Sequence, residues 1–174
     1  MLRIAGVKGI AWGLLAAWVI DDAEELATMA GWSREAPGQV RAVLPGVPDR
    51  VVEQLPMSSR EAATAIGLTG VVMAAASAAG ARSGGRSAFF QAALTGFGAH
   101  GVTHLAQSAA LRRYTPGLVT TPLVVLPFSL WAWRRLRAYG VPAAAPDRRL
   151  TLALAAVVPL SHAIARLPRL RRTR

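Results

Sequence analysis

The chain has 174 residues, of which 53% are hydrophobic and only 17% are charged, and its formal net charge is +11. It contains no cysteine, which excludes disulfides and thiolate chemistry. The basic residues lie mostly between long uncharged runs, which is typical of membrane anchors facing lipid head groups rather than of a surface that binds nucleic acid. We therefore predict a single membrane domain, residues 1–174, that contacts the lipid bilayer and no nucleic acid.

Five apolar runs are bounded by charged residues. Because a bilayer offers the backbone no hydrogen bonds, each run is predicted to be a helix, which gives an all-α, polytopic transmembrane bundle. The second run is rich in Ala, Gly and Ser, which allow membrane helices to pack closely. The fifth run is short and contains Pro159, so the alternative is four spans with the last run on the surface. The predicted spans cover residues 9–31, 62–81, 87–111, 115–133 and 150–165.

The long connection over residues 33–60 contains four prolines, beginning with Pro37, which argue against a long regular helix. Two interpretations remain open: a kinked element lying in the membrane interface, or an ordinary structured loop. The interfacial interpretation depends on a partly helical apolar stripe, formed by Val40, Val43, Leu44, Val47, Val51, Val52 and Leu55.

The start and the shape of the fourth helix are indicated by three prolines. Thr115 and Pro116 suit an N-cap and the first helical position. Pro122 and Pro127 are predicted to kink the helix that follows.

Four acids interrupt the first apolar run. On a helix, Asp21, Glu24 and Glu25 lie within an arc of about 100°, and Asp22 lies at its edge. Charges within a membrane are costly, so such acids usually face a protein interior and have partners there.

The three histidines all fall within predicted spans. His100 and His104 are one turn apart on the third span, and His162 lies in the fifth. Counted from the charged residue that precedes each parallel span, Asp21, His100 and His162 lie at the same depth, about 20 Å along their helices. A second layer lies one turn further along, at Glu25, His104 and Arg166. We expect both layers to meet in one cavity near the face covered by residues 33–60.

Carboxylates and imidazoles in a cavity of low dielectric take up protons, pair with cations or bind a metal. Nitrogen and oxygen ligands predict a divalent metal, namely zinc, iron or manganese. Glu24 and Glu25 are the candidate catalytic acid/base groups, and Arg166 is a candidate for charge balance or for binding an anionic group. The candidate metal ligands are Asp21, Glu24, Glu25, His100, His104 and His162.

Three classes of function fit these residues. The leading hypothesis is a metal-dependent membrane enzyme that acts on a lipid-soluble or membrane-facing substrate. The alternatives are a small proton- or ion-coupled transporter and a membrane assembly factor with a structural polar core. The small size of the chain and its lack of an internal repeat argue against the transporter. The substrate stays open, as does the oligomeric state, with a homo-oligomer among the options.

Two segments carry a resemblance to a known family: Asp21-Asp-Ala-Glu24-Glu25, and His104-Leu-Ala-Gln-Ser-Ala-Ala-Leu-Arg-Arg-Tyr-Thr-Pro-Gly117. In them the chain resembles the bacterial membrane-protein family named for its H-x-x-E-E motif, a family of unknown function. The resemblance implies a multi-pass protein of the bacterial inner membrane and implies no activity. The chain departs from the motif at its leading histidine, which is Asp21 here, and aspartate favours harder metal ions than imidazole does.

Overall fold

The structure, a computed structural model, describes the backbone of residues 2–172 and the side chains of residues 5–168. Within these residues every regular element is a helix, which confirms the all-α prediction. The elements are α1 Leu2–Val43, α2 Asp49–Val52, α3 Ser59–Ser83, α4 Ala88–Leu111, the π-helix η1 Thr121–Val125, α5 Leu126–Ala138 and α6 Arg148–Arg172.

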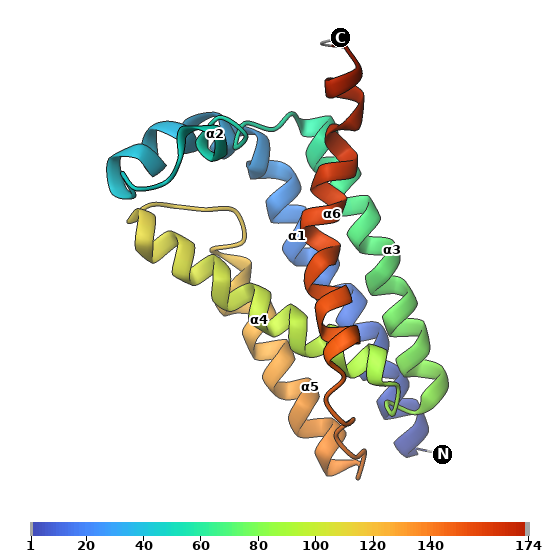
Figure 1. The fold of residues 1–174 in the computed structure, drawn as a ribbon. Coiled ribbons are helices and arrows are strands. Elements are labelled where there is room, and N and C mark those ends of the chain that lie inside the picture. The colour runs from blue at the N-terminus through green and yellow to red at the C-terminus, as the bar shows by residue number, and fades with distance from the viewer. Residues whose placement is uncertain (1, 173–174) are drawn as a thin grey trace.

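Helices α1, α3 and α6 run alongside one another, and α1 and α3 share the most extensive contact (Figure 1). Helix α4 crosses this group and diverges from α6 toward the end where α2 lies, while η1 and α5 return beside α4 (Figure 1). The main core fills the crossing region with Ile10, Leu14, Phe90, Leu94 and Leu136, all of which are almost completely buried.

Glycines on α3 allow its neighbours to approach closely. A Cβ atom added at Gly70 would lie 2.7 Å from the Trp18 ring of α1, and one added at Gly80 would lie 2.5 Å from the Phe90 ring of α4. Only glycine accommodates rings at these positions, so the small residues of α3 serve helix packing as the sequence predicts.

Two of the described helices, Ser59–Ser83 in α3 and Arg148–Pro168 in α6, are long and apolar enough to cross a membrane. This criterion concerns length and composition alone. Helices α1 and α4 carry ionisable and amide side chains, and α5 has only 13 residues, so these three do not meet it. The length and composition of the helices therefore support two membrane-spanning helices and leave the predicted five-span bundle without confirmation.

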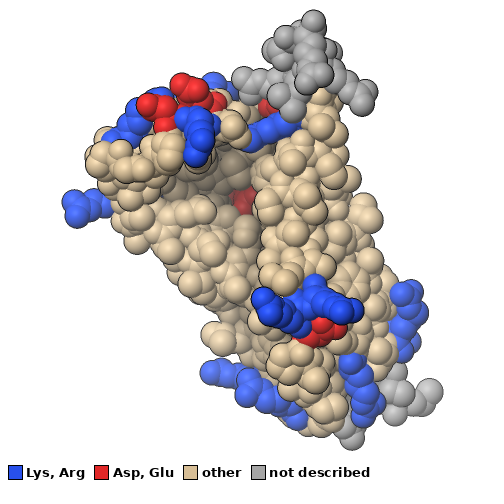
Figure 2. Space-filling model, viewed as in Figure 1, with Lys and Arg blue, Asp and Glu red and all other residues tan. Residues whose placement is uncertain are grey.

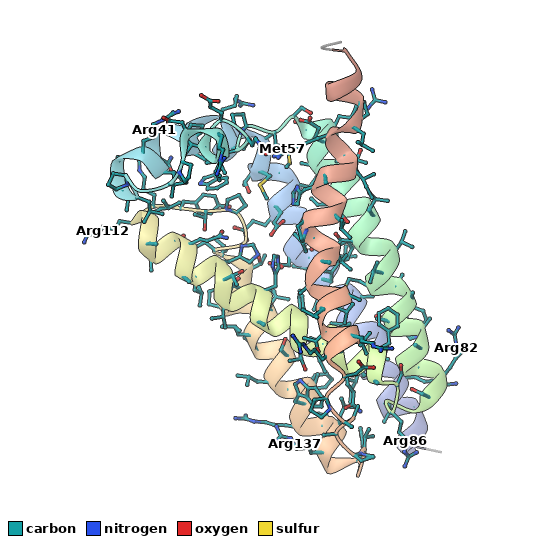
Figure 3. The ribbon with its side chains drawn as sticks, viewed as in Figure 1. Arg41, Met57, Arg82, Arg86, Arg112 and Arg137 are labelled. Carbon is teal, nitrogen blue, oxygen red and sulfur yellow. The ribbon has the colours of Figure 1, made fainter. Side chains whose placement is uncertain are left out.

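On the face shown in Figure 2, charged residues gather toward the two ends of the molecule, and the band between them is uncharged except for an acidic side chain inside a hollow. Arg41 and Arg112 lie at one end, and Arg82, Arg86 and Arg137 lie at the other (Figure 3). Such a band is the surface that a bilayer would require.

Helix α1 extends twelve residues beyond the predicted boundary at residue 31, and it contains Pro37. The prediction that the prolines of residues 33–60 exclude a long helix was therefore wrong for Pro37. A proline within a helix removes one backbone hydrogen bond, here the bond to the carbonyl of Ser33, and it bends the helix without ending it. Figure 1 shows the bend, beyond which the last turns of α1 lean over the end of α4.

Some residues of the apolar stripe within residues 33–60 are buried against α4, and the others are exposed. Val40 and Val52 are buried against Leu111 of α4, with Val47 and Leu55 packed around them. Its remaining members stay exposed on the outer face, namely Val43, Leu44 and Val51. The end of α1 and α2 thus form a small second core over α4, with an apolar outer face.

Replacement of Ser33 by alanine is expected to loosen this second core. The buried Ser33 hydroxyl accepts a hydrogen bond from the Met57 amide at 3.0 Å and lies 3.2 Å from the Met57 carbonyl oxygen. The substitution leaves that buried amide without a partner, which costs about 1–3 kcal/mol. Thermal unfolding in detergent measures the loss. Thr64→Ala is the control, because its exposed hydroxyl bonds only to its own helix; equal stability of the two variants would contradict the expectation.

The fourth helix begins later than predicted. Thr115 and Pro116 are not helical, and η1 starts at Thr121. The connection between α4 and η1 instead folds back against α1, where a carboxylate from α1 accepts its free amides. Pro122 lies in the first turn of the π-helix and Pro127 in the first turn of α5, and the kinks at these prolines stay a prediction.

Candidate metal centre

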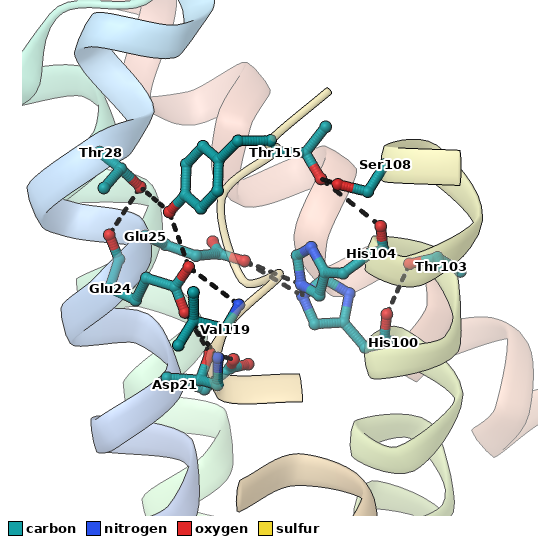
Figure 4. Close-up of polar contacts among 12 residues, drawn as sticks. Asp21, Glu24, Glu25, Thr28, His100, Thr103, His104, Ser108, Thr115 and Val119 are labelled. Carbon is teal, nitrogen blue, oxygen red and sulfur yellow. Dashed lines mark hydrogen bonds and ion pairs between the residues drawn. The ribbon is translucent and has the colours of Figure 1, made fainter. Parts of the chain in front are cut away.

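Four ionisable side chains from α1 and α4 converge at mid-height in the bundle. Asp21 and Glu25 lie one turn apart on α1, and His100 and His104 lie one turn apart on α4 (Figure 4). One ligand atom from each lies within 4.8 Å of the other three. We call these four residues the Asp/Glu/His cluster.

Glu25 lies at the centre of the Asp/Glu/His cluster. Its Oε1 atom is 2.9 Å from His104 Nε2 and 3.5 Å from His100 Nε2. The two Nε2 atoms are themselves 2.9 Å apart, and the imidazole rings meet edge to face. Two nitrogens and one oxygen therefore share a space the size of one coordination sphere.

Hydrogen bonds do not satisfy all of these atoms. Glu25 Oε1 lies within ion-pair distance of both imidazoles, so it is paired when one of those Nε2 atoms carries a proton. Asp21 Oδ2, by contrast, is buried without a partner. Lone pairs that converge in this way would be satisfied by a cation bound between them.

The cluster is enclosed on three sides. Asp21, Glu25 and His104 are 0%, 8% and 5% exposed, whereas the His100 side chain is 35% exposed. Figure 2 shows a hollow bordered by the bent end of α1, by α4 and by α6, with an acidic side chain visible at its floor. His100 is therefore the member of the cluster that solvent or a ligand reaches most readily.

Glu24 points away from the Asp/Glu/His cluster and binds the connection between α4 and η1. Its carboxylate accepts hydrogen bonds from the Thr120 amide at 2.8 Å, the Val119 amide at 3.2 Å and the Tyr114 hydroxyl at 2.6 Å (Figure 4). These amides belong to the first turn before η1, so Glu24 acts as a helix cap supplied by another helix.

Thr120 joins the connection to both acids. Its hydroxyl lies 2.5 Å from Asp21 Oδ1 and 2.7 Å from Glu24 Oε2. The hydroxyl is the donor in both contacts, so its one proton is shared between the two carboxylates. Asp21 thereby connects the Asp/Glu/His cluster with the network around Glu24.

Gly117 packs against the ring of His104. Its φ of 82° lies in the left-handed region, and an added Cβ would be 2.8 Å from three atoms of that ring. Glycine is required on both grounds. The connection therefore forms the back of the site, where it limits the rotation of His104.

The remaining candidates lie outside the Asp/Glu/His cluster. Asp22 is buried beside it on α1. His162 and Arg166 lie one turn apart on α6, and His162 interacts electrostatically with Glu25 and His100. The structure thus brings together four of the six predicted ligands and leaves Glu24 and His162 outside the group.

Sequence reasoning missed Tyr114, Gly117 and Thr120 as parts of the site. None has a side chain that periodicity or depth along a helix would single out. Tyr114 and Gly117 belong to the second segment that resembles the family, and Thr120 lies three residues beyond it, so that segment was the signal that could have found them.

Tyr114 is expected to ionise late in a pH titration. Burial and the hydrogen bond to Glu24 raise the pKa of its phenol above the ordinary value of 10.0. Stabilisation from this contact is thus fully present below pH 10 and is lost as the pH rises through the higher folded-state pKa. The difference in tyrosinate absorbance between wild type and Tyr114→Phe isolates this group. Glu24→Gln should lower the midpoint toward 10; a wild-type midpoint at or below 10 would contradict the expectation.

Comparison with known proteins adds one match. A family model described as a protein of unknown function with an HXXEE motif matches residues 12–132. The match contains all four residues of the Asp/Glu/His cluster and the connection behind it. No curated protein and no solved structure matches the chain.

Proposed function

The chain belongs to the HXXEE-motif family of unknown function, and we propose from the geometry of its Asp/Glu/His cluster that it is a metal-dependent membrane enzyme. Its substrate would be lipid-soluble or would face the membrane. The observation that carries the proposal is the approach of Asp21, Glu25, His100 and His104 ligand atoms to within 4.8 Å of one another in a largely buried position.

The donor set fits a divalent transition metal. Two imidazole nitrogens and two carboxylate oxygens match the ligands of zinc, iron and manganese sites in helical bundles. Hydrogen bonding leaves the buried Asp21 Oδ2 without a partner, which favours a cation over a purely structural network. When bound, such an ion would supply Lewis-acid polarisation of a substrate oxygen.

Individual residues would hold the ion, accept a proton or position the connection between α4 and η1. Asp21 and His104 would hold the ion from the enclosed side, and His100 would hold it at the open side, where the substrate approaches. The second carboxylate oxygen of Glu25 would accept a proton from the substrate or from water. Glu24 would position the connection at the back of the site.

The bundle would lie in the membrane with α1, α3, α4, η1–α5 and α6 as its five spans. The uncharged band between the two charged ends supports this arrangement (Figure 2). So do the apolar side chains that α6 exposes, including Leu152, Leu160 and Ile164, which lipid would cover. The hollow beside the Asp/Glu/His cluster would then open sideways toward the acyl chains.

A proton-coupled transporter is the second candidate, and one observation favours it. Short contacts run from Asp21 through the Thr120 hydroxyl to Glu24 and on to the Tyr114 hydroxyl. Tyr114 is 40% exposed, so the run leads from the buried cluster toward solvent. Such a chain of exchangeable protons is the form that a relay takes.

The metal content of the purified protein tests the leading proposal. Wild type in mild detergent should contain stoichiometric zinc, iron or manganese by elemental analysis, and His104→Ala should lose it. Glu35→Gln is the matched control, because Glu35 is an exposed acid of the same helix. Metal-free wild type that also gains no thermal stability from any of the three ions would overturn the proposal. Proton flux into liposomes from such a metal-free protein would favour the transporter.

A further inference from the structure

A second group of polar side chains lies on α6, beside the open side of the Asp/Glu/His cluster. His162 and Arg166 are one turn apart, so both occupy one face of α6. His162 interacts electrostatically with Glu25, His100 and Arg166, and such interactions weaken with distance. Helix α6 also borders the hollow seen in Figure 2. His162 therefore lies close enough to the cluster to interact with Glu25 and His100, and Arg166 lies one turn further along α6.

Both side chains have nitrogen atoms without partners. His162 Nδ1 and Arg166 Nε are completely covered, and each lacks a hydrogen-bond partner. Within the described part of the chain, no acid lies within 4 Å of the Arg166 guanidinium, although Asp21, Asp22, Glu24 and Glu25 lie together on α1. A buried donor without a partner destabilises a protein by about 1–3 kcal/mol, and more if it is charged. The Arg166 Nε donor, and His162 Nδ1 where it carries the proton, therefore have no acceptor among the described residues.

We propose that His162 and Arg166 bind the anionic head group of an amphiphilic substrate, an assignment that rests on the proposed enzyme function. The planar guanidinium fork matches the oxygen atoms of a phosphate or carboxylate, and His162 supplies a further donor one turn away. A head group held there would lie between α6 and the Asp/Glu/His cluster. The charge of Arg166 would then be balanced by the substrate instead of by an acid of the protein.

The apolar part of the substrate has a path along α6. Leu160, Ile164 and Leu167 flank the two polar residues and are exposed. In the proposed membrane arrangement, acyl chains would cover these side chains, so an alkyl chain could remain in lipid while its head group enters the hollow. An amphiphile with one anionic oxygen group at the end of an alkyl chain has both properties.

Binding of hexyl phosphate and of hexanol to zinc-treated protein, measured by calorimetry, tests this assignment. Wild type should bind hexyl phosphate, and Arg166→Gln should bind it at least tenfold more weakly. Arg166→Lys retains the charge without the fork and should fall between the two. Arg82→Gln, at the opposite end of the molecule (Figure 3), should match wild type. Zinc content, measured on the same samples, should be equal in all four proteins and reports that each variant is folded.

The assignment is overturned if Arg166→Gln binds hexyl phosphate as tightly as wild type does. Wild type that binds hexanol as tightly as hexyl phosphate would also overturn it, and that result needs no variant. The proposed enzyme function fails separately. Wild type without bound zinc that still binds hexyl phosphate through Arg166 would reject the metal and retain the anion site, whereas zinc-bound protein whose binding of hexyl phosphate does not depend on Arg166 would reject the anion site alone.

Discussion

Glu25→Gln is expected to lower the affinity of the protein for zinc by about 100-fold or more. Glutamine retains the shape of the side chain but replaces a negative carboxylate with a neutral amide, and Glu25 Oε1 is the atom that both imidazoles approach. Residues that only support metal ligands typically contribute 10–100-fold to affinity, so a direct ligand should contribute at least the upper figure, about 2.7 kcal/mol. Competition with a chelator of known affinity measures the loss.

Glu35→Gln controls for the change in charge on α1, and it should leave the affinity within about twofold of wild type. Removal of Glu25 should also release the two imidazoles from their anionic neighbour, so the variant should take up little zinc even when it is folded. A Glu25→Gln protein that binds zinc as tightly as the Glu35→Gln control does would show that the Asp/Glu/His cluster is not the metal site.

Gly117→Ala is expected to damage both the stability and the metal affinity of the protein, although it removes no ligand. The new methyl group would meet the His104 ring at 2.8 Å, and the backbone would remain at a φ of 82°. Backbone strain of about 1–2 kcal/mol and overpacking of about 1–3 kcal/mol together predict a loss of about 2–5 kcal/mol. Displacement of His104 should weaken zinc binding as well.

Two other glycines separate these effects. Gly84 also has a positive φ, of 62°, but an added Cβ there would meet no atom within 4 Å, so Gly84→Ala reports backbone strain alone. Gly67 lies within α3 with open space around it, and Gly67→Ala should be neutral or slightly stabilising. Thermal unfolding and zinc affinity of the three variants in the same detergent provide the comparison. If Gly117→Ala were no less stable than Gly84→Ala, the contact with His104 would be irrelevant.

The proximity of α1 acids and α4 histidines was predictable because helix geometry is regular. Residues at equal depth on parallel helices lie at equal height, which was enough to bring Asp21 and Glu25 level with the histidine pair. The same regularity could not assign directions to Glu24 and Glu25. Successive residues on a helix point about 100° apart, and which of two neighbouring acids faces α4 depends on how α1 is rotated in the bundle.

The connection behind the site was not predictable for a different reason. Thr115 and Pro116 have the local chemistry of a helix start, and local chemistry was all that the sequence offered. The amides before η1 instead find their acceptor in Glu24, which is 96 residues away from Thr120 in sequence. A tertiary contact of this kind overrides a local capping preference, and it also explains why Gly117 can lie against His104.

The part of the site on α1 is synthesised well before the part on α4 and on the connection that follows α4. Asp21 and Glu24 emerge from the ribosome about 90–99 residues before the connection that they bind, or about 5–20 s at usual elongation rates. In the proposed membrane arrangement, α1 would enter the bilayer with four acids and none of their later partners. Because unpaired carboxylates are costly within the bilayer, α1 should stay beside the translocation machinery until α4 is inserted. Alternatively, its acids should be protonated until then. Biogenesis of this bundle would then be governed by the arrival of its histidines.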